Sequence, residues 1–331
     1  MHKWLETLDK GVVCCGWNYC GQRLVAGYID GFVSIHDSTD PISVPSLIQS
    51  FRWKASEDVI SNVIWVPPEY GDAIACVCID GTVSLWEEVR TDDEPLSWKL
   101  CLQLEASNVQ VLDLQLGVSS TSLLKMIIAY SDGHVKIYEF LDPLDLKKAQ
   151  LQAEFPNVID SVSNIRKASC VSASIAWNPR RDEIQHSTFV LGFSADLPQF
   201  NSAKIWEFDE AHQRWLPVAE LALPEDKGDK VQSLAWAPNI GRPYEIIAVA
   251  TWKGIAIWHV NMSSDSSSGH NSSKKVALLS DHDSEVWQLE WDMSGMTLAS
   301  TGGDGMVRLW QSNLNGVWHE QAAIDCGAVQ H

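Results

Sequence analysis

Apolar and polar residues follow a pattern that recurs six times along the chain. In each unit an apolar strand is followed by a turn and then by an alternating strand that ends in a ring-bearing residue. These residues are His36, Trp86, Tyr138, Trp206, Trp258 and Trp310, so successive units lie 50, 52, 68, 52 and 52 residues apart. Alternation is typical of β-strands, because successive side chains point to opposite faces of a sheet. The spacing therefore predicts an internal structural repeat.

Each unit contains further strand and turn signals. Four units have an Asp-Gly pair at the turn, at positions 30–31, 80–81, 132–133 and 304–305, and the fifth has Lys253-Gly254. Asp-Gly between alternating strands predicts a hairpin with a type I′ turn, because glycine accepts the positive φ that this turn requires. A strand before each hairpin ends in Trp17, Trp65, Leu116, Trp177, Trp236 or Trp291. A fourth strand is expected at 46–53, 98–104, 149–155, 215–223, 275–279 and 317–324.

Four antiparallel strands per unit predict an all-β fold, a β-propeller of six four-stranded blades. Two longer insertions separate units, at 157–168 and at a serine-rich tract within 263–273, and the repeat resumes after each. We therefore expect a single domain over residues 1–331. The serine-rich tract lacks apolar residues that could anchor it, so we expect a mobile loop over 261–275.

The sixth unit resembles a WD40 repeat. His282 precedes its first strand, Asp304 stands six residues before Trp310, and hydroxyl residues lie in the strand over 298–303. In WD40 repeats a histidine, an aspartate, a hydroxyl and the tryptophan form hydrogen bonds within one blade. The other units retain only parts of this pattern, since the fifth has Trp252 in place of the aspartate.

One strand is left over after six blades are counted. Residues 2–8 alternate weakly, with a tryptophan near their start, and precede the first blade, while the sixth blade already has its own fourth strand. The count predicts that residues 2–8 are the outer strand of a blade whose other strands are missing. A frayed tail or a closed six-bladed ring are alternatives that counting leaves open. The candidate partner-binding residues at this open edge are Lys3, Trp4, Leu5, Leu8, Trp287 and Trp318.

Composition excludes several classes of function. The chain has 24 Lys and Arg against 43 Asp and Glu, a net charge of −19, which disfavours direct binding to nucleic acids and to anionic membranes. Its apolar runs are far shorter than the ~20 residues that span a bilayer, so we expect no membrane insertion. The first residues contain no apolar segment of the signal-peptide kind.

The candidate chemistry is equally sparse. Eight cysteines include no Cys-x-x-Cys pair, which favours reduced thiols in the cytosol or nucleus over a disulfide framework or zinc site. Phosphate-binding glycine loops, paired metal-ligating histidines and nucleophile elbows are absent from the sequence. We therefore expect no cofactor, no metal, no catalytic residues and no enzymatic activity.

Several longer runs resemble the Seh-type nucleoporins, the Sec-thirteen homologues. They begin at Trp65-Val-Pro-Pro-Glu-Tyr-Gly-Asp, Ala176-Trp-Asn-Pro, Ala235-Trp-Ala-Pro-Asn-Ile-Gly-Arg and Val286-Trp-Gln-Leu-Glu-Trp, and the resemblance covers all six units. The chain departs from the family in its N-terminal strand and in having His36-Asp37 where Trp-Asp is usual.

The resemblance implies an open six-bladed propeller that an α-solenoid nucleoporin completes in trans with a three-stranded insertion. Such a pair belongs, with other nucleoporins, to the Y-complex scaffold of the nuclear pore outer ring at the nuclear envelope, which supports mRNA export and protein transport. The family also implies a role in SEA/GATOR-type nutrient signalling, with a cytoplasmic pool or one at lysosomal or vacuolar membranes. A Sec-thirteen-like vesicle-coat subunit and a closed WD40 adaptor of a ubiquitin ligase are the remaining alternatives.

The charge generates a first prediction. The isolated chain should show no saturable binding to single-stranded RNA at physiological salt, because its net charge of −19 repels the phosphate backbone. Filter binding with labelled RNA measures this. Saturable binding under those conditions would overturn the expectation that any role in mRNA export is architectural.

Overall fold

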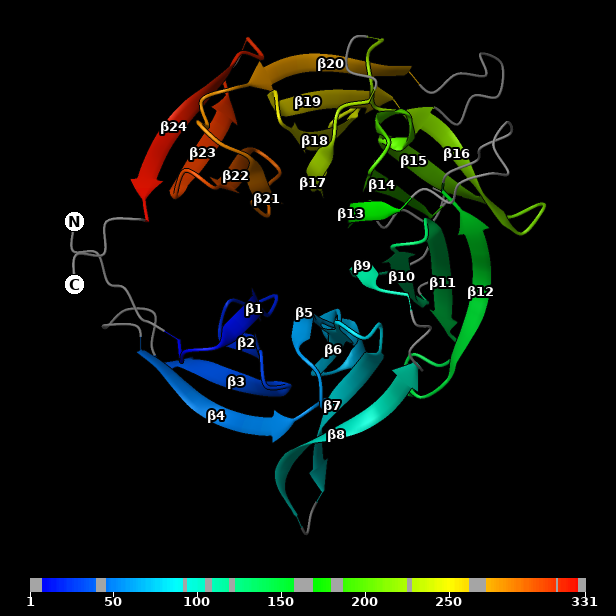
Figure 1. Cartoon of the computed structure of the whole chain (residues 1–331), viewed down its shortest axis with the longest axis vertical. Helices are drawn as coiled ribbons and strands as arrows, with labels where there is room; N and C mark the ends of the chain where they lie inside the picture. The colour runs from blue at the N-terminus through cyan, green and yellow to red at the C-terminus, as the bar shows by residue number, and fades with distance from the viewer. Residues whose placement is uncertain are drawn as a thin grey trace. The chain divides into compact units, whose positions relative to one another are not determined.

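The computed structural model describes residues 8–39, 46–91, 94–104, 109–118, 123–157, 169–179, 187–224, 228–261, 272–313 and 315–326. These residues contain 24 strands arranged in six four-stranded sheets, with two short 3-10 turns at Pro68–Tyr70 and Pro198–Phe200 (Figure 1). Neighbouring strands in each sheet are consecutive in the chain. The sheets are the blades of a β-propeller, so the predicted all-β WD40 propeller class is confirmed.

The strands of the first three blades follow the predicted units closely. Blade one contains β1 (Val12–Trp17), β2 (Arg23–Tyr28), β3 (Phe32–Thr39) and β4 (Ser46–Lys54). Blade two contains β5 (Ile60–Trp65), β6 (Ala73–Cys78), β7 (Val83–Thr91) and β8 (Glu94–Leu104). Blade three contains β9 (Val111–Val118), β10 (Leu124–Tyr130), β11 (His134–Phe140) and β12 (Ala149–Pro156).

The last three blades repeat this arrangement. Blade four contains β13 (Cys170–Trp177), β14 (Thr188–Ala195), β15 (Ser202–Asp209) and β16 (Arg214–Glu220). Blade five contains β17 (Val231–Trp236), β18 (Glu245–Thr251), β19 (Gly254–Asn261) and β20 (Ser272–Leu279). Blade six contains β21 (Val286–Trp291), β22 (Thr297–Gly302), β23 (Met306–Ser312) and β24 (Trp318–Asp325).

The chain divides into two compact units. The first holds blades one and two with most of blade three, and the second holds the rest of blade three with blades four to six. A single domain over residues 1–331 remains a prediction. The expected loop over 261–275 is shorter than predicted, because Asn261 ends β19 and residues 272–275 pair with β19 as part of β20. Residues 272–275 alternate between exposed and half-buried positions, and a β-bulge at Val276 joins them to the rest of β20.

The hairpin turns differ from the predicted type. A type I′ turn needs positive φ at both central residues, yet among the described non-glycine residues only Gln213 has positive φ. In blade one the amide of Gly31 (φ 78°) instead donates to the carbonyl of Tyr28 at 3.2 Å, so glycine is the fourth residue of the turn. A Cβ on Gly31 would lie 2.1 Å from the carbonyl oxygen of Ser56. Glycine is therefore required by both the backbone angle and this close approach.

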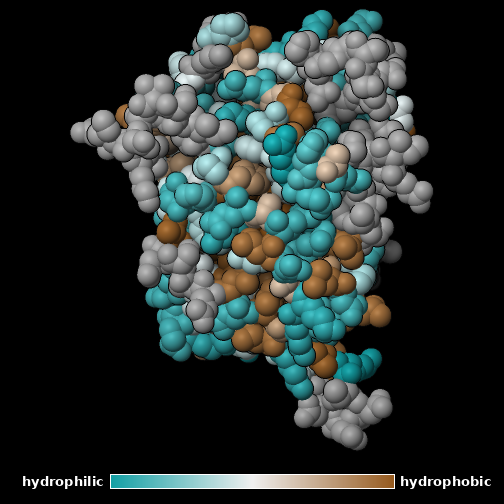
Figure 2. All heavy atoms as spheres, turned by 90° about the vertical axis from the view of Figure 1, so that its right-hand side faces the viewer, coloured by the Kyte–Doolittle hydropathy of each residue, from teal (hydrophilic) through white to brown (hydrophobic). Residues whose placement is uncertain are grey.

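Middle strands are buried and fourth strands are exposed. All residues of β6, β10 and β14 are buried, whereas β12 and β24 are mostly half-buried or exposed. Figure 2 shows the side of the molecule on which β12 and β16 lie in Figure 1, and hydrophobic residues there lie among hydrophilic ones. This gradient fits a blade whose outermost strand alternates between packed and solvent-facing positions.

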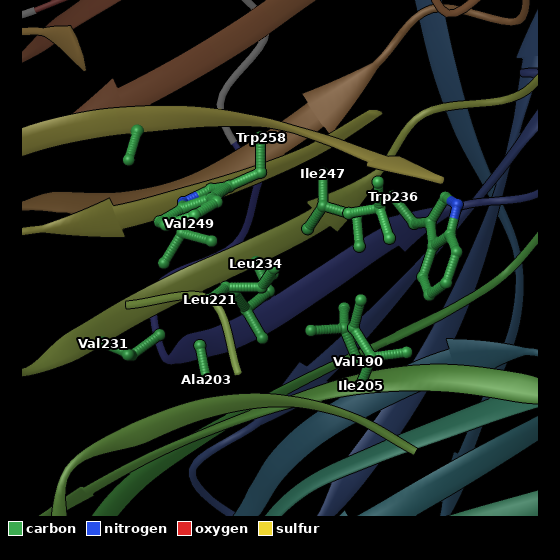
Figure 3. Packing of buried hydrophobic residues seen from close by; sticks show 12 residues of the cluster. Val190, Ala203, Ile205, Leu221, Val231, Leu234, Trp236, Ile247, Val249 and Trp258 are labelled. Carbon is green, nitrogen blue, oxygen red and sulfur yellow. The ribbon is translucent and has the colours of Figure 1, made fainter. Parts of the chain in front are cut away.

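Apolar side chains from neighbouring blades form the core between them. Figure 3 shows this in the second unit, where Val190 and Ile205 of blade four meet Leu234, Trp236 and Ile247 of blade five. Each of these side chains is at most 5% exposed. Their burial from water is the main stabilising contribution to this contact.

A hydrogen-bonded chain of four side chains ties blade six together, as predicted. His282 bridges Asp304, through Nδ1 and Oδ2 at 2.9 Å, and Ser300, through Nε2 and Oγ at 2.7 Å. The indole Nε1 of Trp310 donates to the same Ser300 Oγ at 2.8 Å. Burial opposes ionisation of Asp304, but hydrogen bonds from Met306 N and His282 outweigh it, so the pKa of this carboxyl lies below its usual value.

Removal of the shared hydroxyl should destabilise the protein. Ser300 is fully buried, so Ser300→Ala leaves Trp310 Nε1 and the His282 ring without their partner and should lower the free energy of unfolding by about 1–3 kcal/mol. Urea unfolding followed by circular dichroism measures this loss. The exposed Ser272→Ala is the matched control, and an equal effect of both variants would contradict the role of the four-residue chain.

Candidate partner-binding edges

The first strand of a blade presents two apolar side chains to the preceding blade. In β5 these are Val63 and Trp65, which are 4% and 5% exposed and belong to the core shared by blades one and two. The indole Nε1 of Trp65 donates to the carbonyl of Gly16 in β1 at 3.0 Å. Blade two thus covers a face of blade one.

The same contact recurs between blades five and six. Leu289 and Trp291 of β21 pack into the core formed with blade five. Trp291 Nε1 donates to the carbonyl of Ala235 in β17 at 3.2 Å, and the amide of Leu289 donates to Ser233 Oγ at 3.2 Å. Trp65 and Trp291 thus make the same contact with the blade before them.

Blade one has the equivalent residues, but they are exposed. In the strand registers Cys15 and Trp17 of β1 occupy the places of Val63 and Trp65 in β5. Cys15 is exposed and Trp17 is 52% exposed. Within the described part of the chain Trp17 Nε1 makes no hydrogen bond. We name Cys15 and Trp17 the blade-one edge.

Blade six has a complementary uncovered face. In blade five Ala248, Ile255, Ile257 and Leu279 pack against blade six and are at most 7% exposed. The registers place Ala299, Val307, Leu309 and Ile324 at the same positions of blade six. The first three are only half-buried, and Ile324 is 44% exposed. These four residues are named the blade-six edge.

The structure places the predicted edge residues in different surroundings. Lys3, Trp4 and Leu5 lie outside the described residues, and Leu8 is half-buried in a segment without strand structure. Trp287 is 65% exposed near the start of β21. Trp318 packs edge-on against Trp291, with ring centroids 5.8 Å apart, on the side of blade six that faces blade five. The partner-binding surface that we propose therefore contains the blade-six edge residues and does not contain Trp318.

Reactive groups are few in the described residues. All eight cysteines lie in described segments and are free thiols. Burial raises the pKa of the Cys14 thiol to about 12 and that of Cys101 to about 11, so these thiols are protonated at neutral pH. No group of three or more metal-ligating side chains occurs in the parts of the chain that the structure describes. No helix within those parts is long and apolar enough to cross a membrane.

A small cavity lies between blades four and five. Asn201, Asp229 and Trp258 are among its lining residues, and its volume is about 30 Å³. A space of this size accommodates a water molecule, whereas cofactor sites occupy several hundred Å³. The cavity therefore offers no cofactor site, and the exposed blade edges are the better candidates for function.

The two equivalent tryptophans should differ in their effect on stability. In the isolated chain Trp65→Ala should cost about 3–5 kcal/mol, because it empties a packed core position. Trp17→Ala should cost less than about 1 kcal/mol, because its side chain is half exposed and fills no core. Guanidinium unfolding of the two variants makes the comparison. Equal losses would mean that the chain itself covers Trp17.

Comparisons with known proteins agree with this fold and with the sequence patterns. Residues 273–311 match the WD40 family model, described as WD domain, G-beta repeat. A solved structure of Chaetomium thermophilum Sqt1, bound to the N-terminus of the ribosomal protein L10, is similar with a TM-score of 0.58. It covers 94% of this chain and 74% of that chain at 18% identity, which shows likeness of fold alone.

Full-length relatives identify the family. Protein SEH1 of Arabidopsis thaliana is 58% identical over 325 residues, which cover 98% of this chain and 99% of the relative. Nucleoporin SEH1 of Homo sapiens is 30% identical over 313 residues, covering 91% of this chain and 82% of the relative. The resemblance inferred from the runs around Trp65, Trp236 and Trp291 is thereby confirmed. The chain belongs to the SEH1 family of WD40-repeat nucleoporins.

Proposed function

We propose that the protein is a non-enzymatic scaffold subunit of the nuclear pore complex, located in the outer-ring Y-complex at the nuclear envelope. Its direct partner is an α-solenoid nucleoporin that donates three β-strands. These strands, together with residues 3–8 of this chain, form one further blade, which packs on the blade-one and blade-six edges. Membership of the SEH1 family supports the nuclear pore role.

One observation carries the proposal. Trp17 occupies the same register position as Trp65 but is 52% exposed, against 5% for Trp65. A side chain that is buried in an equivalent blade and exposed here is available for a sheet supplied by another molecule. Leu309 and Ile324 occupy the positions by which blade five meets its neighbour, which supports a partner sheet at the blade-six edge as well.

The physical argument favours a β-sheet partner. Burial of apolar surface contributes ~25 cal/mol per Å², and a permanent complex commonly buries more than ~2,000 Å². A donated blade meets two apolar faces at once, and its backbone groups pair with an edge strand as in other strand-addition complexes. The added blade would therefore couple the partner tightly to this chain.

Other nucleoporins of the Y-complex are the further partners in this proposal. The protein would support mRNA export and nucleocytoplasmic protein transport by holding the scaffold together, without binding RNA itself. The same edges would serve in a SEA/GATOR-type nutrient-signalling complex or in a vesicle coat. The solenoid protein that copurifies in stoichiometric amount from cells decides between these assemblies.

Charged residues on the blade-six edge should disrupt the complex. Leu309→Asp and Ile324→Asp place a carboxylate at the face that meets the donated blade, where its desolvation is costly. Each should reduce copurification of the solenoid nucleoporin by at least about tenfold, a cost of about 1.4 kcal/mol. Affinity purification followed by quantitative mass spectrometry measures the yield.

The matched control is Leu144→Asp, because Leu144 is 92% exposed in the loop between β11 and β12. This variant should copurify the partner normally. Circular dichroism should show folded blades in all three variants. Normal copurification with both edge variants would contradict the use of the blade-six edge.

The N-terminal segment provides a separate test. Deletion of residues 2–8, or replacement of Leu5 and Leu8 by Asp, should weaken the same complex and leave the six blades folded. An unchanged yield from these variants would show that residues 3–8 do not belong to the added blade, even where the blade-six edge proves essential.

A further inference from the structure

Blades five and six share a rim on which turns and strand starts lie together. Val231 at the start of β17 pairs with Thr251 at the end of β18, and Val286 of β21 pairs with Gly302 of β22 in the same way. The hydrogen bond from Leu289 N to Ser233 Oγ aligns the two blades in register. Trp252, just after Thr251, and Trp287, just after Val286, therefore lie on the same side of neighbouring blades. We call the surface formed by these two residues and the loop 281–285 the turn rim.

Two tryptophans project from the turn rim into solvent. Trp252 is 66% exposed and Trp287 is 65% exposed, although tryptophan is usually among the most buried side chains. The fold does not require a large side chain at these positions. Trp287 is the β-bulge residue of β21, and the equivalent bulge residue of β17 is the polar Gln232. The residue of blade six that is equivalent to Trp252 is Gly303.

Both indoles are held in place by their surroundings. Trp252 Nε1 donates to Asp229 Oδ1 at 3.0 Å, and Lys253 Nζ forms an ion pair with Asp229 Oδ2 at 2.7 Å. Lys253 Nζ also lies over the Trp252 ring, 5.6 Å from its centroid. The Trp287 ring lies so close to Gly303 that a Cβ there would be 3.0 Å from it. Aromatic side chains that are fixed before binding lose little conformational entropy on contact, which is typical of interface anchors.

Three carboxylate residues precede Trp287 in the chain. Asp281, Asp283 and Glu285 precede it on the loop that enters β21, and all three are exposed. Within the described residues Asp283 and Glu285 form no ion pair, whereas Asp281 interacts electrostatically with Arg308 and Asp304 bonds to His282. Exposed indole faces attract cations, and adjacent free carboxylates add long-range attraction for positive charge.

From these contacts we infer that the turn rim of blades five and six binds a basic peptide segment of a partner protein. Arginine or lysine side chains of the segment stack on Trp287 and on the exposed part of Trp252, where Lys253 already shows that this ring accepts a cation. Asp283 and Glu285 pair with their charges. This surface is separate from the blade-one and blade-six edges. Its occupation therefore does not depend on the donated blade.

The test uses the full chain and two fluorescein-labelled peptides of alternating glycine and a charged residue, one with arginine and one with glutamate. Fluorescence anisotropy should show binding of the arginine peptide alone, weakened by added salt. Trp252→Ala and Trp287→Ala should each weaken binding about two- to fivefold, the effect of losing one exposed cation–π contact. Trp287→Phe should retain most of the affinity, because it keeps an aromatic face.

Two controls separate this site from general attraction to an acidic protein. Ile240→Ala and Met293→Ala change exposed apolar residues in the loops at the other ends of β17 and β21, 70% and 85% exposed, and leave the net charge unaltered. They should bind the arginine peptide as the unaltered chain does. If the tryptophan variants also bind unchanged, or if the peptide fails to bind, the inference is wrong.

Discussion

The structure depends on one constraint: each four-stranded sheet has two apolar faces, and only another sheet can cover each of them. Two first-strand tryptophans, Trp65 and Trp291, meet this constraint, because each indole packs on the preceding blade and also donates a hydrogen bond to its first strand. Trp65 bonds to Gly16 and Trp291 bonds to Ala235 in this way. In the first blade Trp17 is 52% exposed, and in the last blade Leu309 is half-buried, whereas Trp65 and Ile257 at the equivalent positions are at most 5% exposed.

Packing between blades also explains why the WD40 signature is uneven along the chain. Blade six keeps the complete His282, Ser300, Asp304 and Trp310 chain, and the family model matches residues 273–311, which contain these four. In blade two the registers place Cys76 at the position of Ser300, and Trp86 Nε1 donates instead to Ser84 Oγ on its own strand at 3.0 Å. A blade can therefore lack the hydrogen-bonded chain of four side chains where contacts with neighbouring sheets hold its strands in place. Apolar contacts between blades, in contrast, occur at more than one blade pair.

Strand order and blade number were predictable from the sequence, because the period-two pattern and its regular spacing reflect burial directly. The turn type was not predictable, because it depends on how closely the chain that follows the blade approaches the turn, as Ser56 approaches Gly31. The edge residues were also missed. Cys15-Gly-Trp17 reads like any other first strand, and its exposure becomes evident only when its register is compared with that of Val63 and Trp65. A comparison of equivalent positions across repeats could have found Trp17 as a candidate, but not its exposure.

Cys15 offers the most direct test of the uncovered blade, because it lies exposed two residues before Trp17. The measurement is the alkylation rate of each thiol, resolved by peptide mass spectrometry, in the isolated chain and in its complex with the copurifying solenoid protein. Cys20, exposed in the turn between β1 and β2, serves as the internal reference. The account predicts that the complex protects Cys15 while Cys20 reacts as before. Equal labelling of Cys15 with and without the partner would contradict it.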